Sequence, residues 1–96
     1  MTVTEQAEVV ASIDKLLELK NNKLRIPEKL SKFVKDGVFE LRVHHPNKIS
    51  RSFYFFYEGE HILFTNGFIK KSQKTPLNEI NKAIKLKKYF LDNIEN

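Results

Sequence analysis

The sequence has 96 residues, of which 41% are hydrophobic, and it contains eight Phe and three Tyr but no Cys and no Trp. This composition predicts one small folded domain over residues 1–96, and it excludes a disordered chain, a disulfide-bonded scaffold and thiol catalysis. The formal net charge of +5 at pH 7 favours a polyanion, a membrane surface or an acidic protein as partner.

The charge is distributed unevenly along the chain. Residues 1–20 hold four acidic and two basic side chains, a net −2, whereas residues 68–88 hold seven lysines and one glutamate, a net +6. No apolar run approaches the ~18 residues of a membrane span, and the N-terminus lacks the basic and apolar regions of a signal peptide. Together with the absence of Cys, this predicts a cytoplasmic protein with no membrane partner.

The first predicted element is an amphipathic helix over residues 2–20. Thr2 and Glu5 have the spacing of a capping box. Apolar residues then recur at the helical period, and this stripe is expected to face the core: Val9, Val10, Ile13, Leu16 and Leu17. Residues 26–35 predict one or two further helical turns, with Pro27 in the first turn.

Three strands are predicted next, joined as an antiparallel meander by short turns at Pro46-Asn47 and Glu58-Gly59-Glu60. The first covers residues 38–44 and alternates between an apolar face and a polar face. The apolar face holds Phe39, Leu41 and Val43, and the polar face holds Glu40, Arg42 and His44. The second covers residues 51–57 and is aromatic on both faces, which predicts a central position. The third covers residues 61–66.

A lysine-rich connection and a final helix are predicted to end the chain. Gly67 is expected to break the third strand, Thr75 to cap the helix and Pro76 to begin it, with the helix running over residues 76–91. Cations beside a helix N-terminus suit a phosphate, although a solvated lysine loop is the alternative. The predicted fold class is therefore α+β: a small antiparallel sheet packed by an N-terminal helix or helices and one C-terminal helix.

Three blocks of this sequence carry a family resemblance. They are Gly37-Val38-Phe39-Glu40-Leu41-Arg42, then Arg51-Ser52-Phe53-Tyr54-Phe55-Phe56, then the stretch from Gly67 to Pro76. In this order and spacing the blocks resemble the phage-derived HigB-like branch of the RelE/ParE toxin superfamily. The resemblance implies a RelE-like fold and the toxin of a type II toxin-antitoxin system that cleaves mRNA on the translating ribosome.

The resemblance also implies partners. These are the ribosome with its mRNA and a cognate helix-turn-helix antitoxin of the HigA-like kind, in which an acidic segment is expected to meet residues 70–74 or the last helix. A homodimer and a heterotetramer with the antitoxin both stay open. Two other functions also stay open: a non-catalytic basic module that binds nucleic acid or antitoxin, and a ParE-like gyrase inhibitor.

Metal-independent RNA cleavage needs a base for the 2′-OH, cations on the phosphate and a proton donor for the leaving oxygen. The three histidines lack supporting Cys or clustered carboxylates, so no metal site and no cofactor are predicted. By resemblance, the catalytic candidates are Arg51, Lys70, Lys71 and Lys74, with His44 as an acid or base. The RNA-binding candidates are Arg42, Lys48, Gln73 and Tyr89.

Alternatives accompany these assignments. Arg51 could form a surface ion pair with Glu58 or Glu60, His44 could be a turn residue before Pro46, and Glu40 could be a base or a partner that positions Arg42. Proteins of the family usually begin with a strand, whereas here a helix begins near Met1. This predicts an open edge of the sheet, covered by an antitoxin segment or a second copy, or else a degenerate or truncated toxin.

Overall fold

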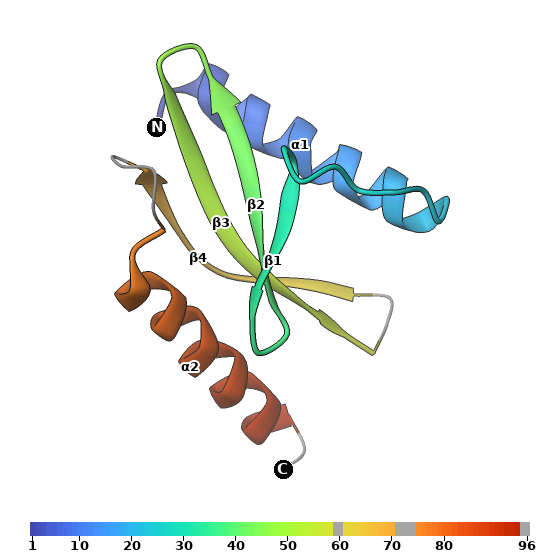
Figure 1. Cartoon of the computed structure of the whole chain (residues 1–96), viewed down its shortest axis with the longest axis vertical. Coiled ribbons are helices and arrows are strands. Elements are labelled where there is room, and N and C mark those ends of the chain that lie inside the picture. The colour runs from blue at the N-terminus through green and yellow to red at the C-terminus, as the bar shows by residue number, and fades with distance from the viewer. Residues whose placement is uncertain (59–60, 71–74, 95–96) are drawn as a thin grey trace.

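The computed structural model describes residues 1–58, 61–70 and 75–94. In chain order the elements are α1 (Val3–Asn21), β1 (Ser31–Lys35), β2 (Val38–His45), β3 (Lys48–Tyr57), β4 (His61–Lys70) and α2 (Leu77–Ile94). The strands form one antiparallel sheet in the order β1-β2-β3-β4, which confirms the predicted α+β class (Figure 1). Neither of the two helices is long and apolar enough to cross a membrane.

The two helices pack against opposite faces of the sheet. Adjacent residues of a strand point to opposite faces, and Phe53 and Tyr54 of the central strand β3 belong to different apolar clusters. The α1 face gathers Tyr54, Leu41 and Val43 around Leu16 of α1. The α2 face gathers Phe53 and Val38 around Ala83 of α2. The prediction that β3 is central and aromatic on both faces is therefore confirmed.

The start of α1 has the predicted capping box. The hydroxyl of Thr2 accepts a hydrogen bond from the backbone N–H of Glu5, and the carboxylate of Glu5 accepts one from the backbone N–H of Thr2. The same carboxylate pairs with Lys48 of β3, with 2.6 Å between Nζ and Oε2. Glu5 therefore caps the N-terminus of α1 and also links the helix to the sheet.

Glu5 should make stability depend on acid pH. The hydrogen bond from Lys48, followed by that from the Thr2 backbone, lowers the pKa of Glu5 from 4.5 to about 2. A depressed pKa means that the stabilisation is present above the unfolded-state pKa and is lost as the pH falls from 4.5 towards 2. Glu5→Gln, which keeps the capping hydrogen bonds, should flatten this loss in thermal unfolding measured across that range. Glu18→Gln is the control, since Glu18 only faces Lys15 at 3.9 Å, and equal curves for both variants would contradict the assignment.

The prediction of one or two helical turns over residues 26–35 is confirmed only for a single turn that begins at Pro27. The backbone N–H groups of Leu30 and Ser31 bond to the carbonyl of Pro27, and the chain then becomes the strand β1. In β1, Ser31 pairs with Leu41, and its hydroxyl hydrogen-bonds that of Tyr54. A short apolar run fits a helix or a strand equally well by periodicity, so the pairing with β2 decides the outcome.

The presence of β1 also corrects the expected open edge. β1 pairs with β2 from Val38 to Leu41, and the backbone N–H of Arg42 donates to the carbonyl of Leu30 at 2.8 Å. The chain's own residues therefore cover the edge for which an antitoxin segment or a second copy was expected.

The lysine-rich connection also differs from the prediction. Gly67 does not break the third strand, because β4 continues to Lys70. A Cβ atom at Gly67 would lie 3.1 Å from the carbonyl of Arg51, so glycine permits the close approach of β4 to β3 at this point. The predicted cap is also wrong by one residue, because α2 begins at Leu77 and the carbonyl of Pro76 accepts its first hydrogen bonds. The hydroxyl of Thr75 donates to Glu40.

Candidate functional site

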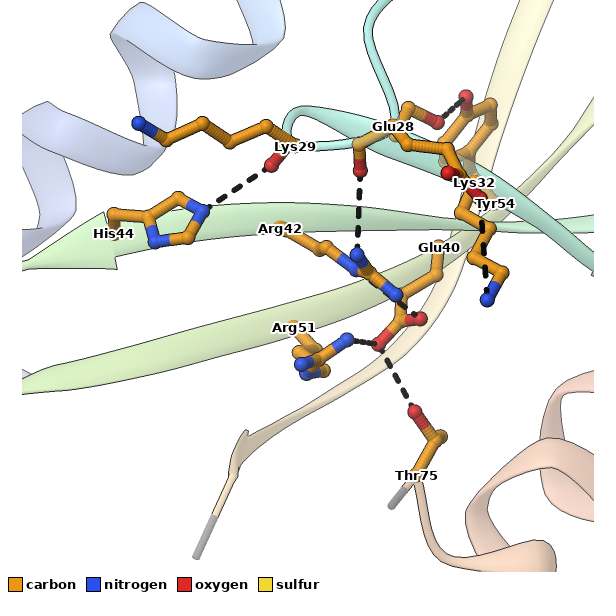
Figure 2. A network of polar contacts seen from close by, with 10 residues as sticks. Glu28, Lys29, Lys32, Glu40, Arg42, His44, Arg51, Tyr54 and Thr75 are labelled. Carbon is orange, nitrogen blue, oxygen red and sulfur yellow. Dashed lines mark hydrogen bonds and ion pairs between the residues drawn. The ribbon is translucent and has the colours of Figure 1, made fainter. Parts of the chain in front are cut away.

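A buried carboxylate lies between two arginines on the α2 face of the sheet (Figure 2). Glu40 of β2 is 2% exposed and Arg51 of β3 is 4% exposed. Nη1 of Arg51 donates to Oε1 of Glu40, and Nε of Arg42 lies 3.7 Å from Oε2 of the same carboxylate. The cluster therefore holds two cations and one anion, an excess of one positive charge.

Strand geometry brings these three residues together. The period of two puts Glu40 and Arg42 on the same face of β2, and the antiparallel register places Arg42 directly opposite Arg51 of β3. Thr75, two residues before α2, donates its hydroxyl to Oε1 of Glu40 at 3.2 Å. The cluster thus joins the two central strands to the beginning of the last helix.

The two guanidinium groups are not fully satisfied by the residues that the structure describes. Nη1 of Arg42 donates to the carbonyl of Glu28 at 3.3 Å. However, Nε of Arg42 and Nε of Arg51 are buried and have no hydrogen-bond partner among the described residues. Leaving a buried charged donor without an acceptor costs free energy, and such exceptions in folded proteins call for an explanation. The excess positive charge of the cluster favours an anionic ligand.

His44 lies two residues beyond Arg42 on β2. Its Nε2 is 3.2 Å from the carbonyl of Lys29, and because a carbonyl can only accept, Nε2 carries the hydrogen. Nδ1 is then the acceptor atom of the neutral ring. His44 is exposed, so this atom is available to a proton donor from solvent or a ligand.

The other predicted site residues are dispersed. Lys70 ends β4, where its backbone pairs with Ile49 of β3. Lys48 lies on the opposite face, paired with Glu5 of α1, and Tyr89 is exposed on α2. The predicted residues Lys71, Gln73 and Lys74 lie outside the described part of the chain.

Arg51 does not form the surface ion pair that the sequence offers as an alternative. Its partner is Glu40, neither Glu58 nor Glu60, and the pair is buried in the sheet. The turn at Pro46-Asn47 indicates which residues of β2 and β3 face each other. Counting outward from that two-residue turn pairs residue 45 with 48 and hence Arg42 with Arg51, beside Glu40.

A second polar cluster lies beneath α1. Nδ1 of His45 is 3.0 Å from Oε1 of Glu8, and Nε2 is 2.9 Å from Oγ of Ser50. A carboxylate at Nδ1 fixes the proton there, so Nε2 of the neutral ring accepts from Ser50. This serine–histidine–glutamate arrangement resembles a nucleophilic triad. Because Ser50 is buried and cannot meet a substrate, we interpret the arrangement as a structural link between α1 and the sheet. In the described ranges, no three His, Cys, Asp or Glu side chains gather so that they could hold a metal ion.

Comparison with known proteins gives one informative match. The model of the family described as phage-derived protein Gp49-like matches residues 1–88, and this family is commonly associated with RelE-like toxins. No curated protein and no solved structure matches the chain significantly. The matched range includes the carboxylate and both arginines of the α2-face cluster.

Proposed function

Because the match spans residues 1–88, the chain belongs to the phage-derived Gp49-like family, and we propose that it is the toxin of a type II toxin-antitoxin pair of the HigB-like branch. Its proposed activity is cleavage of mRNA on the translating ribosome. The four-stranded sheet with a helix on either face is compatible with a RelE-like fold. Fold and family do not by themselves specify a reaction, so the proposal depends on the site.

The observation that carries the proposal is the pair of arginines around Glu40. A phosphodiester has non-bridging oxygens that gain negative charge in the transition state, and a guanidinium fork binds two such oxygens and stays protonated. The cluster has one uncompensated positive charge, and the side chain of Arg42 is 23% exposed. Arg42 and Arg51 therefore suit the scissile phosphate.

The reaction uses the nucleophile that RNA carries itself. The 2′-oxygen attacks the adjacent phosphorus, the bond to the 5′-oxygen breaks, and the products are a 2′,3′-cyclic phosphate and a 5′-hydroxyl. A base takes the proton of the 2′-OH, and an acid returns a proton to the 5′-oxygen. The charges stay balanced because the phosphate remains a monoanion before and after the step.

His44 and Glu40 have different roles in this scheme. The Nδ1 atom of His44 accepts the 2′-OH proton, since Nε2 is tied to Lys29 and the imidazole is exposed on the strand that holds Arg42. Oε1 of Glu40 already accepts from Arg51 and from Thr75, so Glu40 positions the arginines and takes no proton. Lys70 is the last residue of β4, Lys71 and Lys74 follow it closely in the sequence, and all three add positive charge. We propose that one of them is the acid that protonates the leaving 5′-oxygen.

The proposed partners follow from the same toxin assignment. A HigA-like helix-turn-helix antitoxin inhibits the chain, with an acidic segment directed to the basic residues of the last helix or of residues 70–74. Translating ribosomes supply the mRNA, which places the activity in the cytoplasm.

The test is induction of the chain in a bacterial host, followed by mapping of mRNA 5′ ends. Wild type should stop growth and produce cuts inside translated frames, with 5′-hydroxyl ends that accept an adapter only after phosphorylation. Arg51→Lys keeps a positive charge for Glu40 but lacks the planar fork, and we expect about 10²-fold fewer cuts, the typical loss of one transition-state donor. His44→Asn should also lose the cuts.

Lys23→Ala, at an exposed residue just after α1, is the matched control and should cut as wild type does. Growth arrest without cuts would indicate a gyrase inhibitor, and a folded chain that causes no arrest would indicate a non-catalytic binding module. Either result would end the nuclease proposal.

A further inference from the structure

The outward side of α2 carries a row of basic side chains around a tyrosine. Lys82, Lys85 and Lys88 are exposed, and Tyr89 is 68% exposed. Ala83, Ile80 and Ile84 form the opposite, sheet-facing side of the same helix. At 100° per residue, Lys82, Lys85 and Tyr89 point directly away from the sheet and Lys88 flanks them. These four residues are called the α2 basic stripe below.

The charges of the α2 basic stripe are not neutralised by the described part of the chain. No carboxylate of a described residue forms an ion pair with Lys82, Lys85 or Lys88. Other lysines of the protein are engaged. Lys15 and Lys32 pair with glutamates, and Lys87 of the same helix donates to the carbonyl of Asp36 at 2.6 Å.

The stripe lies on the side of the molecule that also holds the buried arginines. α2 packs on the face of the sheet that contains Phe53, the strand partner of Glu40, and Thr75 just before α2 donates to Glu40. α1 packs on the other face of the sheet (Figure 1). The basic residues of α2 and the helix within the net-negative residues 1–20 therefore lie on opposite faces of the sheet.

We propose that the α2 basic stripe binds the sugar-phosphate backbone of an RNA strand outside the cleavage site, with Tyr89 stacked on one base. Successive lysines three residues apart lie about 4.5 Å apart along the helix axis, so one strand of phosphates can meet more than one of them. An exposed aromatic ring beside the lysines fits a base better than an acidic polypeptide, since every base has a stacking face. This inference deepens the proposed function by naming a second RNA contact.

The experiment measures binding of a fully 2′-O-methylated single-stranded RNA oligonucleotide, which has no 2′-OH nucleophile, over a series of KCl concentrations. Each phosphate contact contributes about 0.7 to the slope of log affinity against log salt for single strands. Lys82→Gln/Lys85→Gln/Lys88→Gln should therefore reduce that slope by about 2. Lys23→Gln/Lys32→Gln/Lys35→Gln removes the same charge at exposed residues away from Arg42 and His44 and should change the slope much less.

Variants of Tyr89 distinguish binding of RNA from binding of any polyanion. Tyr89→Ala should weaken binding by about fivefold or more at unchanged slope, and Tyr89→Phe should bind as wild type does. An equal slope for the two triple variants, or no binding of the oligonucleotide by wild type, would overturn the inference. Wild-type affinity in Tyr89→Ala would overturn it in favour of an acidic protein.

The result is independent of cleavage, because the oligonucleotide cannot be cut. A chain that binds RNA through the α2 basic stripe but leaves mRNA intact in the host would support the inference and refute the nuclease. A chain that cuts mRNA while the two triple variants share one slope would do the opposite.

Discussion

Arg51→Ala should lower the free energy of unfolding by about 3 to 5 kcal/mol, because it leaves the carboxylate of Glu40 buried without its ion-pair partner. Thr75 and the more distant Arg42 would remain as the only described polar neighbours of that carboxylate. This loss is a large part of the ~5 to 15 kcal/mol that stabilises a typical domain. Urea unfolding followed by circular dichroism measures it.

A double variant isolates the pair. Glu40→Met/Arg51→Met replaces both buried charges by apolar groups of similar length, a change that is often neutral for stability. Its free energy of unfolding should therefore lie close to that of wild type, whereas Glu40→Met and Arg51→Met should each be strongly destabilised. Single losses that simply add in the double variant would contradict the pairing.

The same double variant separates stability from function. It should be folded yet produce no growth arrest and no cuts, because the guanidinium fork has gone. Loss of activity in Arg51→Ala alone would not distinguish an unfolded chain from an inactive one, so the double variant and Arg51→Lys carry the functional conclusion. Cutting by the folded double variant would remove Arg51 from the proposed site.

Leu16→Ala should cost about 3 to 5 kcal/mol of unfolding free energy. Leu16 is fully buried and contacts Leu41, Val43 and Tyr54, so truncation leaves a cavity between α1 and the sheet. Urea unfolding gives the total, and amide hydrogen exchange should show that protection falls most in α1.

Val10→Ala is the matched control for this cavity. Val10 is on the same helix but 57% exposed, so its truncation should change stability by less than about 0.5 kcal/mol. Comparable losses for Val10→Ala and Leu16→Ala would mean that helix propensity, and not burial against the sheet, determines the stability of α1.

Several elements could be predicted from the sequence because their signals are local. The capping box of Thr2 and Glu5, the alternation over residues 38–44 and the final helix each depend on residues a few positions apart. The uneven charge was equally visible, since it needs only a count. Local spacing was also enough to place Glu40 and Arg42 on one face of a strand.

The tertiary structure decided what depends on residues distant in the chain. Whether residues 31–35 form a strand or a helix is determined by pairing with the edge of β2, because their apolar pattern fits both. The burial of Arg51 against Glu40 requires the register of β2 and β3, and Lys48 reaches Glu5 only because α1 crosses that face. The sequence by itself determined the elements and the charge of the chain. Packing across the sheet decided which charges are buried together, since a buried charge must find its partner wherever the fold places one.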